Sequence, residues 1–166
     1  MPLVKNGAVV PDAFTHTDAQ SALPEGPVIV PLSRLLAEHE TLLGGNRPVG
    51  VAVSNDADVT TLAPFIDALS VVVLSFPKFR DGRAYSQARL LRERLRYGGE
   101  LRASGNVLRD QILLMARCGF DAFEIDKPSD VGAFASALAT YSVFYQPTGD
   151  GRAIALDLRR RPLQGA

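Results

Sequence analysis

The run 71-VVVLSF-76 is the most apolar stretch of the chain, and the arginine-rich segment 75-SFPKFRDGRAYSQARLLRERLR-96 overlaps its end. The β-branched residues of the apolar run predict a buried strand. Similar apolar pieces recur at intervals of about 20–30 residues, enough for one helix between successive strands. The expected strands are 28-VIVPL-32, 49-VGVAV-53, 71-VVVLSF-76, 101-LRAS-104, 122-AFEI-125 and 142-SVFYQ-146.

Amphipathic segments fill the intervals between these strands. In one of them Ala84, Ala88, Leu91 and Leu95 form an apolar stripe with helical spacing. The expected helices are 33–43, 58–69, 84–97, 106–118 and 129–141. The expected N-caps are Ser33, Asp58, Asn106 and Ser129. Gly98, Gly99 and Gly119 follow helix ends, where a left-handed residue is favoured.

The alternation of strands and helices predicts an α/β fold with a mainly parallel sheet and helices on both faces. Six strands are too few for a complete barrel, so two architectures remain open: a doubly wound open sheet and a partial or compacted β/α barrel. Asn6-Gly7 between β-prone residues predicts an N-terminal β-hairpin. We expect a hairpin and loop appendage (1–27), one α/β domain (28–158) that ends in a turn and a strand, and a flexible tail (159–166).

Composition narrows the possible functions. The 166 residues carry no net charge, 46% are apolar and only one is cysteine, so neither a disulfide within the chain nor a cysteine-based metal site is expected. No signal peptide or membrane-spanning run is visible, and we expect a cytoplasmic protein that binds neither membranes nor nucleic acid. The motifs GxGxxG, GxxxxGK[ST], CxxC, HExxH and GxSxG are missing in functional positions, so no cofactor is identified.

The neutral total hides a cationic region, because residues 78–110 contain nine bases and four acids. Loops that follow parallel strands meet at one edge of the sheet, where ligands bind in both candidate architectures. Guanidinium groups suit oxyanions, so we expect this edge to bind a small oxyanion. The candidate ligand-binding residues are Lys78, Arg80, Arg83, Tyr85, Ser86, Asn106 and Arg109. Alternatively, these arginines are solvated or paired with neighbouring acids.

Two further sets of residues are candidates for other roles. Asp81 and Asp110 are the candidate acid–base catalysts at this edge. Arg89, Arg92 and Arg96 are spaced to share one helix face, which predicts either a docking surface for an acidic partner or a solvated face.

The strings 79-FRDGRAYS-86, 89-RLLR-92, 101-LRASGNVLRDQ-111 and 118-CGFDAFE-124 resemble a bacterial family known as DUF934, whose members are commonly labelled oxidoreductases of sulfite reduction. Weaker likeness covers 6–14 and 144–147. The resemblance implies a role beside sulfite reductase in sulfur assimilation. Because sulfite reduction depends on cofactors, we expect an accessory or anion-binding protein. The alternatives are a small enzyme acting on an oxyanion or phosphorylated ligand, and a structural homo-oligomeric subunit.

Overall fold

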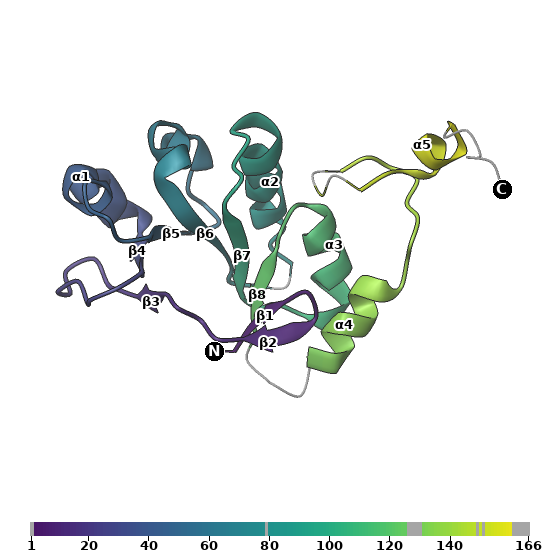
Figure 1. The fold of residues 1–166 in the computed structure, drawn as a ribbon, viewed down its shortest axis with the longest axis horizontal. Coiled ribbons are helices and arrows are strands. Elements are labelled where there is room, and N and C mark those ends of the chain that lie inside the picture. The colour runs from purple at the N-terminus through teal and green to yellow at the C-terminus, as the bar shows by residue number, and fades with distance from the viewer. Residues whose placement is uncertain (1, 79, 126–130, 149, 151, 161–166) are drawn as a thin grey trace.

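The computed structural model describes residues 2–78, 80–125, 131–148, 150 and 152–160. The strands within these residues form one sheet, which curls into a half-barrel (Figure 1). The strands are β1 (Leu3–Lys5), β2 (Ala8–Val10), β3 (Thr15–His16), β4 (Val28–Pro31), β5 (Val49–Val53), β6 (Leu69–Phe76), β7 (Glu100–Gly105) and β8 (Ala122–Glu124). Their order in the sheet is β2-β1-β8-β7-β6-β5-β4-β3.

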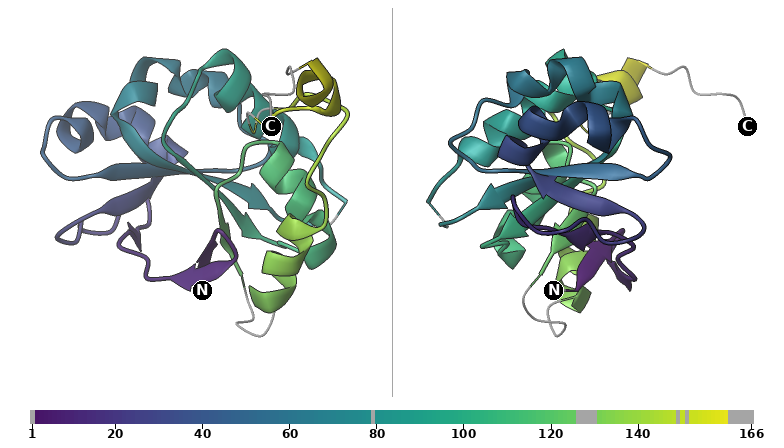
Figure 2. Two further views of the ribbon diagram at one scale, coloured as in Figure 1. Left: turned by 45° about the vertical axis from the view of Figure 1, so that its right-hand side comes forward. Right: turned by 90° about the vertical axis from the view of Figure 1, so that its left-hand side faces the viewer.

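The strand order shows which of the two open architectures the chain adopts. Strands β3 to β8 are parallel and lie side by side in sequence order. Right-handed crossovers that always step in one direction place their helices on one side of a sheet. Figure 2 shows the helices on the convex side and the N-terminal segment on the other. The predicted α/β fold is confirmed in its alternative form, a partial barrel, and the helices cover one face of the sheet instead of both because the strands follow one another in sequence order.

The helices follow the predicted intervals with local differences. They are α1 (Leu32–Leu43), the 3-10 helix η1 (Val59–Ala68), α2 (Arg83–Arg89) with its π-helical continuation η2 (Leu90–Arg94), the 3-10 turn η3 (Arg109–Gln111), α3 (Ile112–Arg117), α4 (Val131–Ala139) and α5 (Ala155–Arg160). None of these helices is long and apolar enough to cross a membrane.

The predicted N-caps have different outcomes. Asp58 is confirmed, because its carboxylate accepts from the Thr60 backbone N–H at 2.9 Å. The prediction that Ser33 is an N-cap is wrong, because α1 begins at Leu32 and its N-cap position is Pro31. The prediction for Asn106 is also wrong, because η3 begins only at Arg109 and its N-cap position is Leu108. Ser129 lies outside the described residues.

The helices and the convex face of the sheet enclose the main core. Leu35, Leu62, Leu91 and Met115 pack from the helices onto every second strand residue. The alternate residues face the concave side, where a small cluster is formed by Ile29, Val71 and Val73 with Phe14 and Ala52. The two faces of one parallel sheet therefore bury different groups, as the two-residue period of strands requires.

The N-terminal hairpin is confirmed and closes one edge of the sheet. Asn6 and Gly7 have φ of 51° and 78°, as a two-residue hairpin turn requires, and β1 pairs antiparallel with both β2 and β8. Thr15 then joins the opposite edge beside Val28. Residues 11–14 consequently cross the concave face from one edge of the half-barrel to the other.

Two predicted strands near the C-terminus are wrong. Residues 142–146 form only an isolated bridge between Phe144 and Ile154, and the expected last strand within 146–158 is replaced by the start of α5. The physical reason is that β1 already occupies the free edge of β8, so no further strand can add there. Of the predicted flexible tail, residues 161–166 lie outside the described residues.

Candidate functional site

The carboxyl ends of β6 and β7 lie next to each other. Phe76 pairs with Gly105, and the backbone N–H of Asn106 donates to the Phe76 carbonyl at 2.7 Å. Gly105 has φ of +89°, and a Cβ at this position would lie 2.7 Å from the same carbonyl oxygen. Only glycine permits this close approach. The loops that contain residues 78–83 and 106–109 therefore start from adjacent points.

The loop after β6 contains a bidentate ion pair. The Arg83 guanidinium donates to both oxygens of Asp81, at 2.9 and 2.6 Å. This interaction holds the pKa of Asp81 well below its ordinary value and raises the pKa of Arg83. Asp81 is therefore stabilised as a carboxylate, which suits it to orient Arg83 and makes it a poor general acid.

Lys78 and Arg80 precede this pair in the same loop, and both are exposed. Neither side chain forms an ion pair or hydrogen bond with any described residue. The structure thus leaves two cationic groups of this loop available to solvent or to an anion.

Tyr85 and Ser86 do not join these cations at the surface. The ring of Tyr85 packs edge-on against Phe76, with 5.1 Å between centroids, and burial raises the pKa of its hydroxyl to about 12. That hydroxyl is buried and has no hydrogen-bond partner among the described residues. Ser86 is exposed and lines a shallow hollow with Arg89 and Glu93. That Tyr85 and Ser86 donate hydrogen bonds to a bound anion stays a prediction, and the structure does not bring their two hydroxyl groups to one site.

Arg109 belongs to a separate groove. It lies in η3 with Asp110, and both line a groove of about 630 Å³ that is also lined by Ser136 of α4 and by Thr140, which follows that helix. Arg109 pairs with no acid in the described part of the chain. Asn106 is exposed at the start of the same loop. The predicted edge therefore divides into a β6 part with Lys78 and Arg80 and a β7 part with Arg109.

The three arginines of the predicted docking face have different environments. Arg89 is exposed and pairs with Glu93 at 3.0 Å. Arg96 follows the helix end in a left-handed conformation with φ of 53°. The sequence predicts this conformation for Gly98 or Gly99 instead, and neither of these glycines has a positive φ. Because η2 widens the helix and ends at Arg94, the three side chains do not continue one regular face.

Arg92 is a structural residue by its contacts. Its guanidinium donates to the carbonyls of Gly119, Tyr97 and Gly99, at 3.0, 2.5 and 2.8 Å, and to the carboxylate of Asp121. Only 13% of the side chain is exposed. Arg92 thus joins the end of the helix to the turn before β8. Its guanidinium donors are engaged in these contacts and are not presented to a partner.

The sequence reasoning did not single out two buried amides at the same edge. Gln87 donates from its amide to the carbonyls of Ser54 and Ala57, at 2.9 and 2.8 Å, and so fixes the turn after β5. Asn55 in that turn is 8% exposed, and its amide nitrogen has no well-formed hydrogen bond within the described residues. It lies close enough to Asp81 to help lower the pKa of that carboxyl. The available signal was the polar string Ser54-Asn55-Asp56 directly after a buried strand.

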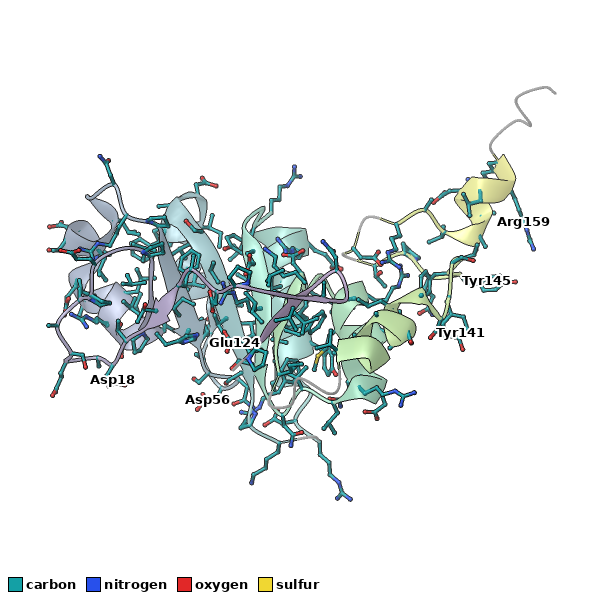
Figure 3. The ribbon with its side chains drawn as sticks, turned by 60° about the horizontal axis from the view of Figure 1, so that its bottom comes forward. Asp18, Asp56, Glu124, Tyr141, Tyr145 and Arg159 are labelled. Atoms are coloured by element: carbon teal, nitrogen blue, oxygen red, sulfur yellow. The ribbon has the colours of Figure 1, made fainter. Side chains whose placement is uncertain are left out.

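The concave face holds an ionic cluster that was also missed. Arg102 is 2% exposed, and it donates to both oxygens of Asp12, at 2.7 and 3.0 Å, and to Glu100 at 2.5 Å. Glu124, which is labelled in Figure 3, lies 3.6 Å from Arg102 and 3.1 Å from the ring of His16. The available signal was the alternation of 100-ELRAS-104, which places Glu100 and Arg102 on one face of the strand.

This cluster fastens the N-terminal segment across the half-barrel. Phe14 lies under the Arg102 guanidinium, 5.3 Å from ring centroid to Cζ. On either side of Phe14 in the chain, Asp12 pairs with Arg102 and His16 hydrogen-bonds to Glu124. Among the described residues, no three His, Cys, Asp or Glu side chains are grouped to hold a metal ion. The arrangement is that of a structural ion-pair network.

A comparison with protein families gives a match. The family described as "Bacterial protein of unknown function (DUF934)" matches residues 50–155, which is more than half of the chain. The matched range includes β5 to β8 and both strand-end loops described above. No protein of the curated set shows a significant match.

Proposed function

The chain belongs to the DUF934 family, and from that premise we propose that it is an accessory protein of assimilatory sulfite reduction that binds a small oxyanion at the strand-end loops after β6 and β7. The link to sulfite reduction rests on the label that members of this family commonly carry. The oxyanion site rests on the geometry of the loops.

One observation carries the site. Lys78, Arg80 and Arg109 are exposed cations on loops that begin at adjacent strand ends, and none of them pairs with an acid of the described residues. Lys78 and Arg80 are two positions apart on one loop, so their charges repel, and an oxyanion bound to that loop relieves the repulsion. Arginine also offers a planar pair of donors that matches sulfate, sulfite or phosphate.

Acid–base catalysis at Asp81 is the weaker candidate function. Arg83 keeps this carboxyl ionised and occupies both of its oxygens, so the pair resembles a fixed part of the loop more than a proton-transfer group. Asp110 shares the groove of Arg109 and is the remaining acid–base candidate. Neither residue supports a named reaction.

The oxyanion site is tested by calorimetric titration of the purified protein with sulfite, sulfate and phosphate. We expect binding with a dissociation constant in the micromolar to millimolar range, and a loss of about tenfold or more when Lys78 and Arg80 are both replaced by alanine. Arg94→Ala is the matched control, because Arg94 is an exposed cation without an ion pair on another part of the surface. Equal binding by both variants, or no binding by the wild type, contradicts the site.

The accessory role is tested separately in cells. Deletion of the gene is expected to prevent growth with sulfate as the sulfur source and to leave growth on cysteine intact. The tagged protein is expected to retain sulfite reductase in a pull-down. Normal growth on sulfate together with an empty pull-down rejects the accessory role and leaves the binding measurement unaffected.

A further inference from the structure

The C-terminal arm, which consists of the described residues within 141–160, projects from the half-barrel (Figure 1), and it exposes apolar side chains. Most of the large apolar side chains that the described chain exposes lie in this arm, with Tyr145 at 79% and Tyr141 at 58%. The others in the arm are Val143, Leu156 and Leu158. Figure 3 shows Tyr141, Tyr145 and Arg159 pointing away from the body. An apolar patch of this kind usually marks a binding surface.

The base of the arm is fixed to the body. The buried guanidinium of Arg117 donates to both oxygens of Asp150, at 2.9 and 2.7 Å, and also to the carbonyl of Gln146. The same guanidinium lies 4.0 Å above the ring of Phe144. The arm is therefore held in a defined direction, while its outer part forms no ion pair with the body among the residues that the structure describes.

The outer part of the arm is cationic as well as apolar. Arg159 and Arg160 form the last turn of α5 and pair with no acid of the described residues. Tyrosine and arginine are the residue types that protein interfaces favour most. The chemistry of the arm consequently fits an acidic surface that also contains an apolar depression.

The opposite end of the same molecule has that chemistry. Residues 17–68 contain seven acids and two arginines, and one of these arginines, Arg34, is buried against Glu38. An apolar hollow of about 410 Å³ opens at the start of α1 and the ends of β4 and β5, with Leu36 on its exposed wall. Its lining consists of Pro31, Leu32, Ser33, Leu36, Ala52 and Ser54. We call it the α1 hollow.

Exposed acids lie on the segments that line the α1 hollow. Glu40 follows Leu36 in α1, beyond a kink at Glu38, and is exposed. Asp56 is exposed two residues after Ser54, and Asp18 lies at the same end of the molecule (Figure 3). The α1 hollow is thus an apolar depression at an acidic end of the molecule, and this combination complements an arm with tyrosines, leucines and arginines.

We propose that the C-terminal arm binds the α1 hollow of a second copy of this chain. In Figure 1 α1 and α5 lie at opposite ends of the longest axis, so the arm cannot reach the hollow of its own molecule. The resulting contact is head-to-tail, and such a contact produces either a closed ring or an open chain of subunits. Electrostatic attraction between the two ends orients the subunits before the apolar side chains are buried.

The first experiment is sedimentation velocity of the purified full chain. We expect reversible association as the protein concentration rises from about 1 µM to about 1 mM. Association is expected to weaken between about 0.1 M and about 1 M salt, because the screening length falls from about 10 Å to about 3 Å. A wild-type protein that stays monomeric over the whole range at low salt overturns the proposal.

The second experiment separates the two surfaces. Tyr145→Glu changes the arm and Leu36→Glu changes the hollow, and each is expected to weaken self-association about tenfold or more. Val9→Glu is the matched control, because Val9 is an exposed apolar residue of β2 outside both surfaces and its variant should associate like the wild type. Circular dichroism verifies that the three variants are folded.

Mixing the two defective variants is the decisive step. The Leu36→Glu protein still has an intact arm and the Tyr145→Glu protein still has an intact hollow, so a head-to-tail contact predicts a one-to-one heterodimer that grows no further. A symmetric contact between two arms predicts no recovery on mixing. Absence of the heterodimer, or unchanged association of either variant alone, overturns the proposal.

Discussion

Asp12 and Arg102 are 90 positions apart in the chain and form a bidentate ion pair on the concave face of the half-barrel. Asp12 comes from the segment that crosses this face, and Arg102 comes from β7 in the middle of the sheet. The pair therefore joins the part of the chain outside the family match to the part inside it. The carboxylate of Asp12 also compensates the charge of Arg102, which is why an arginine can be buried in a strand at this position.

Removal of Arg102 should strongly destabilise the fold. Arg102→Ala leaves the carboxylates of Glu100 and Glu124 without their central cation, and breaking a buried pair in this way costs about 3–5 kcal/mol. Asp12→Asn should cost less, because Arg102 keeps Glu100. Urea denaturation followed by circular dichroism measures both free energies of unfolding. Similar costs for the two variants contradict the central position of Arg102.

Stability should fall at acid pH through Glu124. Burial opposes ionisation of Glu124, but hydrogen bonds from His16 and Ser104 and the charge of Arg102 outweigh burial and lower its pKa below about 4.5. Below that pH the unfolded state binds more protons than the folded state, so the stability that Glu124 contributes is present above it and is lost as pH falls through the folded pKa.

The variant Glu124→Gln tests this contribution. We expect a shallower decrease of the unfolding free energy below about pH 4.5 than in the wild type. Asp67→Asn is the control at an exposed acid, and its curve should run parallel to that of the wild type. An unchanged slope in Glu124→Gln means that other carboxyls, such as Asp12 with its lowered pKa, account for the acid sensitivity.

Gly105 should tolerate no side chain. Gly105→Ala adds a methyl group 2.7 Å from the Phe76 carbonyl oxygen in a left-handed conformation, and we expect a loss of about 1–3 kcal/mol in unfolding free energy. Gly98→Ala is the matched control, because a Cβ there meets no atom within 4 Å. Thermal unfolding should separate the two variants. Equal stability of the pair shows that the strand ends relax apart at little cost.

Arg89 and Arg92 should respond differently to the same substitution. Arg89→Ala removes an exposed pair with Glu93 and should cost about 0–1 kcal/mol. Arg92→Ala leaves the carbonyls of Tyr97, Gly99 and Gly119 without their donor and should cost several-fold more, about 2–4 kcal/mol. Chemical denaturation measures the unfolding free energy of both variants. Equal losses would be evidence against a stabilising role of the hydrogen bonds from Arg92 to the three carbonyls.

The sequence was most informative where structure depends on neighbours in the chain. The apolar runs, the Asn6-Gly7 turn and the Asp58 cap were predicted because each depends on a few consecutive residues. The two C-terminal strands failed because strand formation also requires a free sheet edge, and β1 takes that edge. The buried cluster around Arg102 could not be predicted because its members come from distant segments, and His16 and Glu124 alone are 108 positions apart.

The sequence by itself determined the α/β class, the positions of the buried strands and the excess of arginine behind β6, because these follow from local pattern and composition. Only the tertiary structure decided what each arginine does. Arg89, Arg92 and Arg102 have the same charge and similar neighbours in sequence, yet one is solvated, one binds carbonyls and one is buried among carboxylates. A guanidinium is placed by its acceptors, and the chain supplies those acceptors from distant segments only after the half-barrel has formed.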